Sequence, residues 1–279
     1  MDLARKFARK DISLSVVGMS AVPLTEEQLA AYERDGYLLL RSVLSPDEVV
    51  NLRDNAMTAW AASKPAAETV DLSSQTWLQA SLLPNVHHHS SAVREYYWNG
   101  PLVDIASELI GSANIKGATS QLTFKLKGNT KTFGWHQDNG YGHLDPYTSV
   151  SCLTALDDAD EENGCLRVVP ASHKRGQLAA LTAEMKAANT ELIVEVDEAT
   201  SVPMPMRAGD VLIMHCHTLH ASGPNLTERH RRLLFLRYAN ADAIEVFNEG
   251  KPRLGRLLRG TTRFPEVEAF EADLASAGA

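Results

Sequence analysis

The chain has 279 residues, which suits one large domain with a substantial buried core. Hydrophobic residues make up 44% and charged residues 22%, as in ordinary globular proteins, and there is no apolar run of about 18 residues that would predict a membrane span. Lys and Arg total 27 against 35 Asp and Glu, so the net charge of −8 argues against nucleic acid and anionic membranes as main partners and favours a small-molecule substrate.

The N-terminal part is predicted to be an arm followed by a helix and a strand. Residues 1–23 have weak periodicity and form the expected arm, and a single domain is expected over 24–279. Thr25 is a plausible N-cap for the helix, whose early glutamates suit the positive end of the helix dipole. The Asp-Gly pair at 35–36 ends this helix, and the segment YLLLRSV then predicts a strand.

Two longer helices are predicted next. The segment SPDEVVNLRDNAMTAWAAS has Ser45 at the cap, Pro46 in the first turn and Glu48 three residues after the cap. After an irregular stretch at 64–90, the segment AVREYYWNGPLVDIASELIG predicts one helix that stops at Gly111.

The pattern changes between about 114 and 240, where short runs rich in Val, Ile, Thr and Leu alternate with turn residues. The predicted strands are TSQLTFKLK, TSVSCLTAL, CLRVVPAS, ELIVEVDEA, DVLIMHCHTLH and RRLLFLRYA. The segment QLAALTAEMKAA predicts a helical insertion between strands, and the tail after about 241 has a weak pattern. Several short strands broken by turns indicate a sandwich or barrel. The expected fold is therefore mainly β, a jelly roll with an N-terminal helical layer packed on it.

One predicted strand has a polar and an apolar face. Leucine and phenylalanine alternate with four polar residues, which are Gln121, Thr123, Lys125 and Lys127. By itself, this alternation favours an exposed polar face.

The three cysteines are predicted to be reduced and buried. They lie in or beside apolar runs, are too few for a disulfide scaffold and form no CxxC pair; they are Cys152, Cys165 and Cys216. The basic N-terminus lacks the apolar segment of a secretory signal, so a cytoplasmic location is expected. Nothing in the sequence indicates an oligomeric state.

The motif WHQD suggests half of a metal site. The i, i+2 spacing of His136 and Asp138 points both side chains the same way from an extended segment. The third ligand must come from a distant strand, and the candidates are His215, His217, His220 and His230. Two histidines and one carboxylate with open positions are the ligand set of non-haem Fe(II) oxygenases. Spacing alone leaves open a zinc-type HxH pair formed by the first two of these histidines.

An arginine is expected beside the metal-bearing strand. If His220 ends a strand, the chain turns through SGPN and returns as RRLLFLRY. This hairpin would bring Arg231 or Arg232 close to the metal, where an arginine can grip a carboxylate with two hydrogen bonds. Of the two, Arg232 is expected on a solvated face.

Taken together, these motifs resemble the phytanoyl-CoA dioxygenase family, which includes the bacterial ectoine hydroxylases. The resemblance covers roughly residues 24–240. It is carried by LTEEQLAAYERDGYLLLRSVLSPDEV, WHQD, SVSCLTALDDADEENGCLRVVPASHKRG, AGDVLIMHCHTLHASGPN and the arginine eleven residues after the last histidine. It implies a double-stranded β-helix, which is a cupin-like jelly roll, and the use of Fe(II), 2-oxoglutarate and O2.

The resemblance also implies roles for individual residues. The iron ligands by position are His136, Asp138 and His220. The distal carboxylate of 2-oxoglutarate would bind Arg231, with Ser222 beside it. The polar strand face would then point inward, and the remaining contacts of 2-oxoglutarate would be Gln121, Thr123 and Ser151.

Neighbouring residues receive positional expectations. Gln137 and Trp135 should point away from the metal. The three histidines at 87–89 are expected on a surface loop, with substrate contact as the alternative, and Tyr141 and His143 are candidate substrate contacts. His215 is expected near the metal ligands, whereas His217 and His230 are expected at the periphery. An anionic substrate group could be served by Lys125, Lys127 or Arg94.

The activity implied by the resemblance is that of a dioxygenase that hydroxylates an unactivated C–H bond of a small or medium metabolite and releases succinate and CO2. Halogenating relatives replace the carboxylate of the motif, so Asp138 favours hydroxylation, while desaturation, epimerisation and ring chemistry stay open. One alternative is a cupin-like hydrolase or isomerase using zinc or manganese bound by His215 and His217. Another is a non-catalytic binding domain, against which the intact motif set argues.

Overall fold

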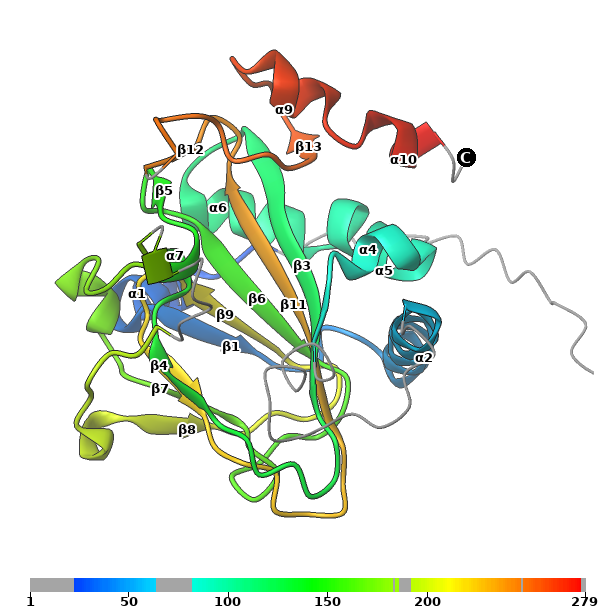
Figure 1. Ribbon diagram of the computed structural model, residues 1–279, viewed down its shortest axis with the longest axis vertical. Coiled ribbons are helices and arrows are strands. Elements are labelled where there is room, and N and C mark those ends of the chain that lie inside the picture. Colours follow the sequence, from blue (N-terminus) through cyan, green and yellow to red (C-terminus); the bar gives the residue numbers. More distant parts are fainter. Residues whose placement is uncertain (1–22, 64–81, 183, 186–191, 247, 277–279) are drawn as a thin grey trace, which may run out of the picture.

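The computed structural model describes residues 23–63, 82–182, 184–185, 192–246 and 248–276 (Figure 1). The predicted arm therefore lies outside the described residues except for Pro23. Most of residues 183–188, the second half of the predicted helical insertion, also lie outside them. Residues 177–182, the first half of that insertion, have no regular structure, so this part of the prediction is wrong. Within the described ranges, every helix is too short or too polar to span a bilayer.

The first two helices begin where their capping residues predict. The helix α1 (Glu26–Asp35) starts with a capping box in which the Thr25 side chain accepts a hydrogen bond from the Gln28 amide, and it ends at Gly36 with φ 83°. The strand β1 (Tyr37–Leu40) follows. The helix α2 (Pro46–Ser63) is capped by Ser45, whose amide donates to the Glu48 carboxylate at 2.8 Å.

The next helical region differs from its prediction. The single helix expected there is two helices, α5 (Ser91–Asn99) and α6 (Leu102–Ile110), because Gly100 and Pro101 interrupt the helical hydrogen bonding. The stretch expected to be irregular contains, in its described part, the strand β2 (Leu82–Pro84) and the helix α4 (Val86–His89).

The strands form two main antiparallel sheets. The larger has the order β1-β9-β6-β11-β3-β13, with β2 also on β3. Its further members are β3 (Ile115–Lys125), β6 (Val150–Ala155), β9 (Val211–His215), β11 (Arg231–Asn240) and β13 (Leu257–Arg259). The smaller has the order β4-β10-β7-β8, formed by β4 (Phe133–His136), β7 (Leu166–Val168), β8 (Val202–Met204) and β10 (His220–Ser222). The expected β-rich jelly-roll class is confirmed.

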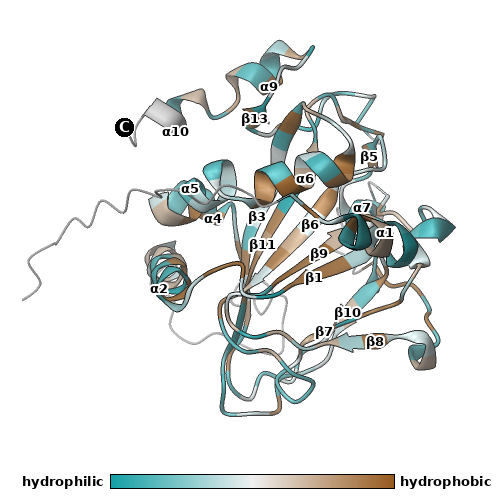
Figure 2. Ribbon diagram, turned by 180° about the vertical axis from the view of Figure 1, so that it is seen from behind, coloured by the Kyte–Doolittle hydropathy of each residue, from teal (hydrophilic) through white to brown (hydrophobic). Residues whose placement is uncertain are grey.

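The larger sheet is covered on both faces. Helices α2, α4, α5 and α6 lie on one side of it, and the smaller sheet lies on the other (Figure 1). Along β11, Leu234 and Leu236 belong to the helix-side core, whereas Leu233 and Phe235 pack in the core between the sheets. Figure 2 shows β1, β6 and β9 as hydrophobic along most of their length, as expected for strands buried on two sides.

Two strand predictions were wrong in extent or existence. The run ELIVEVDEA contains no strand in its described part, 192–199, where the backbone is irregular and leads into a 3₁₀ turn (Glu198–Thr200). A strand needs a row of hydrogen bonds, but this stretch has one such bond to a neighbouring strand, from the Val194 amide to the Trp135 carbonyl at 2.7 Å. The strand predicted from CLRVVPAS is short because Pro170 cannot donate to a ladder.

The tail after residue 241 contains more structure than its weak pattern suggests. The short strand β12 (Ile244–Glu245) pairs with β5 (Leu144–Asp145), and β13 adds to the edge of β3. The helices α9 (Pro265–Ala269) and α10 (Ala272–Ser276) follow.

Candidate metal centre

Three potential metal ligands converge at the end of the smaller sheet. His136 ends β4 and pairs directly with His220, the first residue of β10, while Asp138 opens the short helix α7 (Asp138–Tyr141). Asp138 Oδ1 lies 3.9 Å from His136 Nε2 and 3.5 Å from His220 Nε2. The two imidazole centroids are 4.2 Å apart. Two nitrogens and one carboxylate oxygen therefore face a common point.

Neighbouring groups fix the orientation of all three side chains. His136 Nδ1 lies 2.7 Å from the Gly134 carbonyl, and His220 Nδ1 lies 3.0 Å from the Thr218 carbonyl. Because a carbonyl only accepts, each Nδ1 donates, and each neutral imidazole presents a lone pair at Nε2. The Ser151 hydroxyl donates to Asp138 Oδ2 at 2.5 Å, which leaves Oδ1 toward the histidines. Such outer contacts hold metal ligands in position.

The protonation states also suit a metal. Burial, aided by the nearby His220, lowers the pKa of His136 to about 4. Burial opposes ionisation of Asp138, but His220, His136 and Arg237 together hold the pKa of this carboxyl below its ordinary value. At neutral pH the cluster therefore offers a neutral imidazole and a carboxylate, the forms that bind metals.

Sequence reasoning missed Arg237, which supports the Asp138 turn from β11. This arginine is buried, and its Nη2 donates to Asn139 Oδ1 at 2.8 Å and to Ser149 Oγ at 2.9 Å. Weaker contacts of 3.5 Å reach the backbone carbonyls of Asp138 and Gly142. The sequence did contain a signal for it. Arg237 follows Arg231 by six residues on one strand, and an even spacing predicts that two side chains lie on the same face.

Arg231 lies in the core between the sheets with a donor unused. Its side chain is 2% exposed, and its buried Nε has no hydrogen-bond partner among the described residues. It pairs directly across the sheet with Lys125, so both point to the same face. Burial lowers the pKa of Arg231 to about 10, and burial together with Arg231 lowers that of Lys125 to about 6.

At neutral pH the Lys125 amine is therefore mostly neutral, and Arg231 carries the positive charge of the pair. Neither forms an ion pair with a carboxylate in the part of the chain that the structure describes. Lys125 Nζ contacts the backbone carbonyls of Ser222 at 3.3 Å, Lys131 at 3.2 Å and Gly223, so it holds the turn after β10 in place. Arg231 keeps a donor available and provides a local positive charge inside an acidic protein.

The polar face of β3 points inward, as the family resemblance implies. Thr123 and Gln121 share the face of Lys125 and pair with Leu233 and Phe235, which pack in the core between the sheets. Ser222 is buried on β10.

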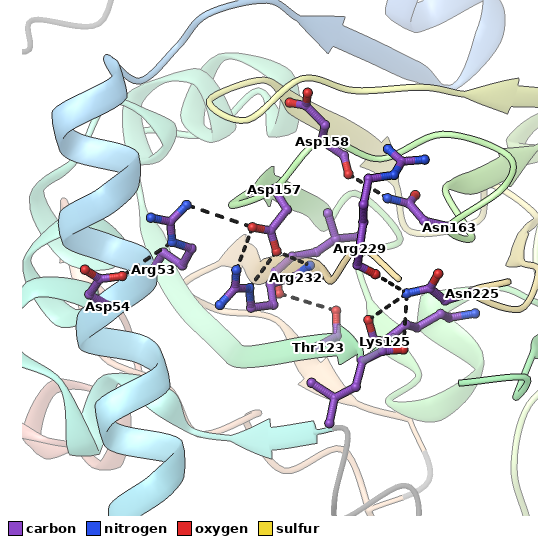
Figure 3. Close-up of polar contacts among 12 residues, drawn as sticks. Arg53, Asp54, Thr123, Lys125, Asp157, Asp158, Asn163, Asn225, Arg229 and Arg232 are labelled. Atoms are coloured by element: carbon purple, nitrogen blue, oxygen red, sulfur yellow. Dashed lines mark hydrogen bonds and ion pairs between the residues drawn. The ribbon is translucent and has the colours of Figure 1, made fainter. Parts of the chain in front are cut away.

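The other basic candidates lie elsewhere. Lys127 is exposed and pairs with Glu228 at 3.1 Å, and Arg94 donates to the His87 carbonyl. Arg232 was expected to be solvated, which is wrong. It is half-buried on the opposite face of β11 and donates to both oxygens of Asp157 at 2.6 and 2.7 Å, while Arg53 of α2 approaches the same carboxylate at 3.9 Å (Figure 3).

His215, Cys216 and His217 each have a potential ligand atom within 4.8 Å of those of the other two. The His217 amide donates to His215 Nδ1 at 3.1 Å, so that nitrogen is occupied. Cys216 lies between them, and burial raises the pKa of its thiol to about 11, which keeps it protonated. His217 is buried against Tyr147 and Asn139, so its expected peripheral position is wrong, whereas His230 is exposed as expected.

Of the remaining residues near the motif, some pack around the metal-ligand cluster and others lie nearer the surface. Gln137 points away from the cluster and donates to the carbonyls of Gly176 and His217, and Trp135 packs on Val169 and Leu219. The Tyr141 ring meets His136 edge-on at 5.4 Å and is 41% exposed. His143 stacks on Tyr147. The three consecutive histidines lie on helix α4 rather than a loop, and His87 is buried.

Known proteins are similar to this chain over most of its length. A family model described as phytanoyl-CoA dioxygenase (PhyH) matches residues 32–233. A methylphosphonate hydroxylase of Gimesia maris is 28% identical over 239 residues, covering 82% of this chain and 87% of the relative. An ectoine dioxygenase of Sphingopyxis alaskensis is 28% identical over 253 residues, covering 83% and 81%.

Solved structures show the same fold. The apo form of EctD from S. alaskensis superposes with a TM-score of 0.66 at 25% identity, covering 86% of this chain and 88% of that chain. The non-haem α-ketoglutarate-dependent carbocyclase SnoK from nogalamycin biosynthesis has a TM-score of 0.68 at 21% identity, covering 87% and 98%.

Proposed function

The chain belongs to the phytanoyl-CoA dioxygenase (PhyH) family of Fe(II)- and 2-oxoglutarate-dependent oxygenases, and from this premise we propose that it hydroxylates an unactivated C–H bond of a small or medium metabolite. The observation that carries the proposal is the convergence of His136 Nε2, His220 Nε2 and Asp138 Oδ1. These residues would hold iron, since two histidines and one carboxylate are the facial ligand set of non-haem iron oxygenases.

The second part of the proposal concerns 2-oxoglutarate. The unused Nε of Arg231, opposite the buried Lys125, fits the distal carboxylate of a dicarboxylate. The inner-face residues Gln121, Thr123 and Ser222 would line the same space, and Ser151 would act through its hydrogen bond to Asp138. Arg231 thus binds and orients the co-substrate, while the walls between the sheets exclude water.

Bound iron supplies the activation of O2, coupled to conversion of 2-oxoglutarate to succinate and CO2. The protein supplies the rest: Asp138 and the two histidines keep their orientation through Ser151 and two backbone carbonyls. The retained carboxylate at Asp138 favours hydroxylation over halogenation. The named relatives include a methylphosphonate hydroxylase and ectoine dioxygenases, which supports a small molecule as substrate. The cytoplasmic location and the exclusion of nucleic-acid partners stay predictions.

The test is anaerobic reconstitution with Fe(II) and 2-oxoglutarate, followed by screening of metabolite libraries. We expect a visible charge-transfer band, and substrate-triggered, O2-dependent succinate with a product heavier by one oxygen atom. A protein that holds zinc and ignores 2-oxoglutarate would instead support the hydrolase alternative. A product that is epimerised or cyclised would retain the oxygenase class and overturn hydroxylation.

A further inference from the structure

A second polar site lies at the far edge of the larger sheet. There β2 pairs with residues 121–123 of β3 and β13 pairs with residues 115–116, which leaves a gap between them. A cavity of about 360 Å³ opens at this gap. Its lining residues come from β3, α4, α5, β12 and the segment after it, and the chain before α10, and they include none of His136, Asp138 and His220.

Three side chains meet on the wall of this cavity. His87 and His88 come from α4, and Glu271 is the residue just before α10, which lies next to α4 and α5 in Figure 1. Glu271 Oε1 lies 2.6 Å from His88 Nε2 and 3.2 Å from His87 Nε2, and its Oε2 also lies 3.2 Å from His87 Nε2. Both histidines therefore direct the same ring nitrogen at one carboxylate.

Surrounding residues hold the side chains of this cluster in place. His87 is 4% exposed, and its Nδ1 lies 2.5 Å from Ser120 Oγ on β3, which holds the ring from behind. Glu271 adopts φ 57°, a left-handed conformation that costs a non-glycine residue energy and persists only where the surroundings demand it. Burial lowers the pKa of His87, so this imidazole is neutral at neutral pH, as a metal ligand must be.

We propose that His87, His88 and Glu271 form a second metal site, for a divalent transition metal of the zinc type. Two histidines and one glutamate are an established zinc ligand set, and ligands about 2.0–2.1 Å from a tetrahedral zinc lie about 3.4 Å from one another. The 3.2 Å separations match this spacing, whereas the 2.6 Å contact would have to lengthen by about 0.8 Å (3.4 − 2.6), a movement that the exposed His88 side chain can make.

The metal would fasten the end of the chain to the helical layer. Glu271 and Phe270 both line the cavity, so a metal that joins Glu271 to the histidines of α4 would fix this wall. To bind the metal through Nε2, the neutral His87 ring would carry its proton on Nδ1, where it would donate to Ser120 Oγ. The site does not depend on the proposed oxygenase chemistry.

The experiment is equilibrium dialysis of the full chain against Zn(II), with metal content measured per protein. The variants are His88→Ala, Glu271→Gln, which keeps a hydrogen-bonding side chain, and His89→Ala, an exposed neighbour on α4 that serves as the control. We expect the wild type and His89→Ala to bind one equivalent more than His88→Ala and Glu271→Gln. Equal zinc content in all four proteins would overturn the proposal.

A second readout separates metal binding from a simple hydrogen-bonded contact. Zinc should raise the melting temperature of His89→Ala more than that of His88→Ala, because only the former retains the site. If His88→Ala lowers the melting temperature equally with zinc and with chelator, the cluster is a structural contact alone. Failure of the oxygenase assignment would leave the difference between these variants unchanged.

Discussion

Oδ1 of Asp138 lies 3.5 Å from Nε2 of His220, although one residue opens α7 and the other begins β10. The approach depends on the pairing of β4 with β10, which places His136 opposite His220. The ligand cluster is therefore a product of strand register in the smaller sheet, and side chains behind it set the direction of each donor.

Replacing Asp138 with Ala should abolish turnover, because it removes one of three ligands and the only carboxylate among them. The measurement is substrate-stimulated succinate formation after Fe(II) reconstitution. Succinate formation at the wild-type rate in this variant would exclude the proposed centre.

Replacing Arg231 with Ala should raise the 2-oxoglutarate concentration needed for half-maximal rate roughly 10- to 100-fold, since a charge-assisted contact is worth about 1.5–3 kcal/mol. Arg232→Ala is the matched control, because Arg232 pairs with Asp157 on the other face of the strand. A larger effect in Arg232→Ala would contradict the proposal, because it would mean that 2-oxoglutarate binds on the face of β11 that carries Arg232.

Replacing Arg237 with Met should weaken Fe(II) binding about 10- to 100-fold, the usual effect of removing a group that orients a ligand. Arg237 holds the Asp138 turn through Asn139 and Ser149, so Arg237→Lys should recover part of the affinity. The measurement is Fe(II) titration under anaerobic conditions. Unchanged iron affinity in Arg237→Met would show that the turn needs no support.

The stability of the metal-free protein should fall as the pH drops from about 6.5 to about 4. Burial lowers the pKa of His217 to about 4 from an ordinary value of 6.5, so in this window the unfolded chain binds a proton that the folded chain refuses. His217 alone lowers the free energy of unfolding by ~2 kcal/mol below pH 4 and has no such effect above pH 6.5. Urea unfolding across this range should show a shallower pH dependence in His217→Gln, and equal slopes would contradict the assignment.

Tyr97→Phe should reduce the free energy of unfolding by about 1–3 kcal/mol. The buried Tyr97 hydroxyl accepts the Thr119 amide at 3.0 Å and donates to the Arg237 carbonyl at 3.1 Å, so its removal leaves backbone groups unsatisfied. Tyr32→Phe is the control, since the Tyr32 hydroxyl is buried with no hydrogen-bond partner in the described parts of the chain and should be dispensable. Chemical denaturation measures both, and equal losses of unfolding free energy would show that the two hydrogen bonds of the Tyr97 hydroxyl add no stability.

The sequence predicted best what is determined locally. The caps at Thr25 and Ser45 act within one helical turn, so their helices begin where expected. The HxD spacing likewise placed His136 and Asp138 together, although choosing His220 over His215 required the family resemblance. In the structure His220 is the direct strand partner of His136, whereas His215 ends β9 in the larger sheet.

The failures concern relationships between distant segments. The run at 191–199 has strand-forming residues, but no neighbouring strand offers a row of partners to its described part. The burial of His217 and the ion pair of Arg232 depend on Tyr147 and Asp157, which lie far away in sequence. The meeting of α4 with the C-terminal segment is likewise invisible without the fold.

Apolar and basic side chains alternate along β3 and β11, and this alternation gives the buried basic residues a role in folding. The two strands place leucine, phenylalanine and tyrosine toward the helices and Lys125, Arg231 and Arg237 toward the other sheet. A slip of one residue would turn these three side chains toward the apolar layer under the helices, which is unfavourable because buried polar groups without partners cost free energy. The basic groups that would hold a dicarboxylate under the proposed function therefore also oppose misaligned pairing of β3 with β11.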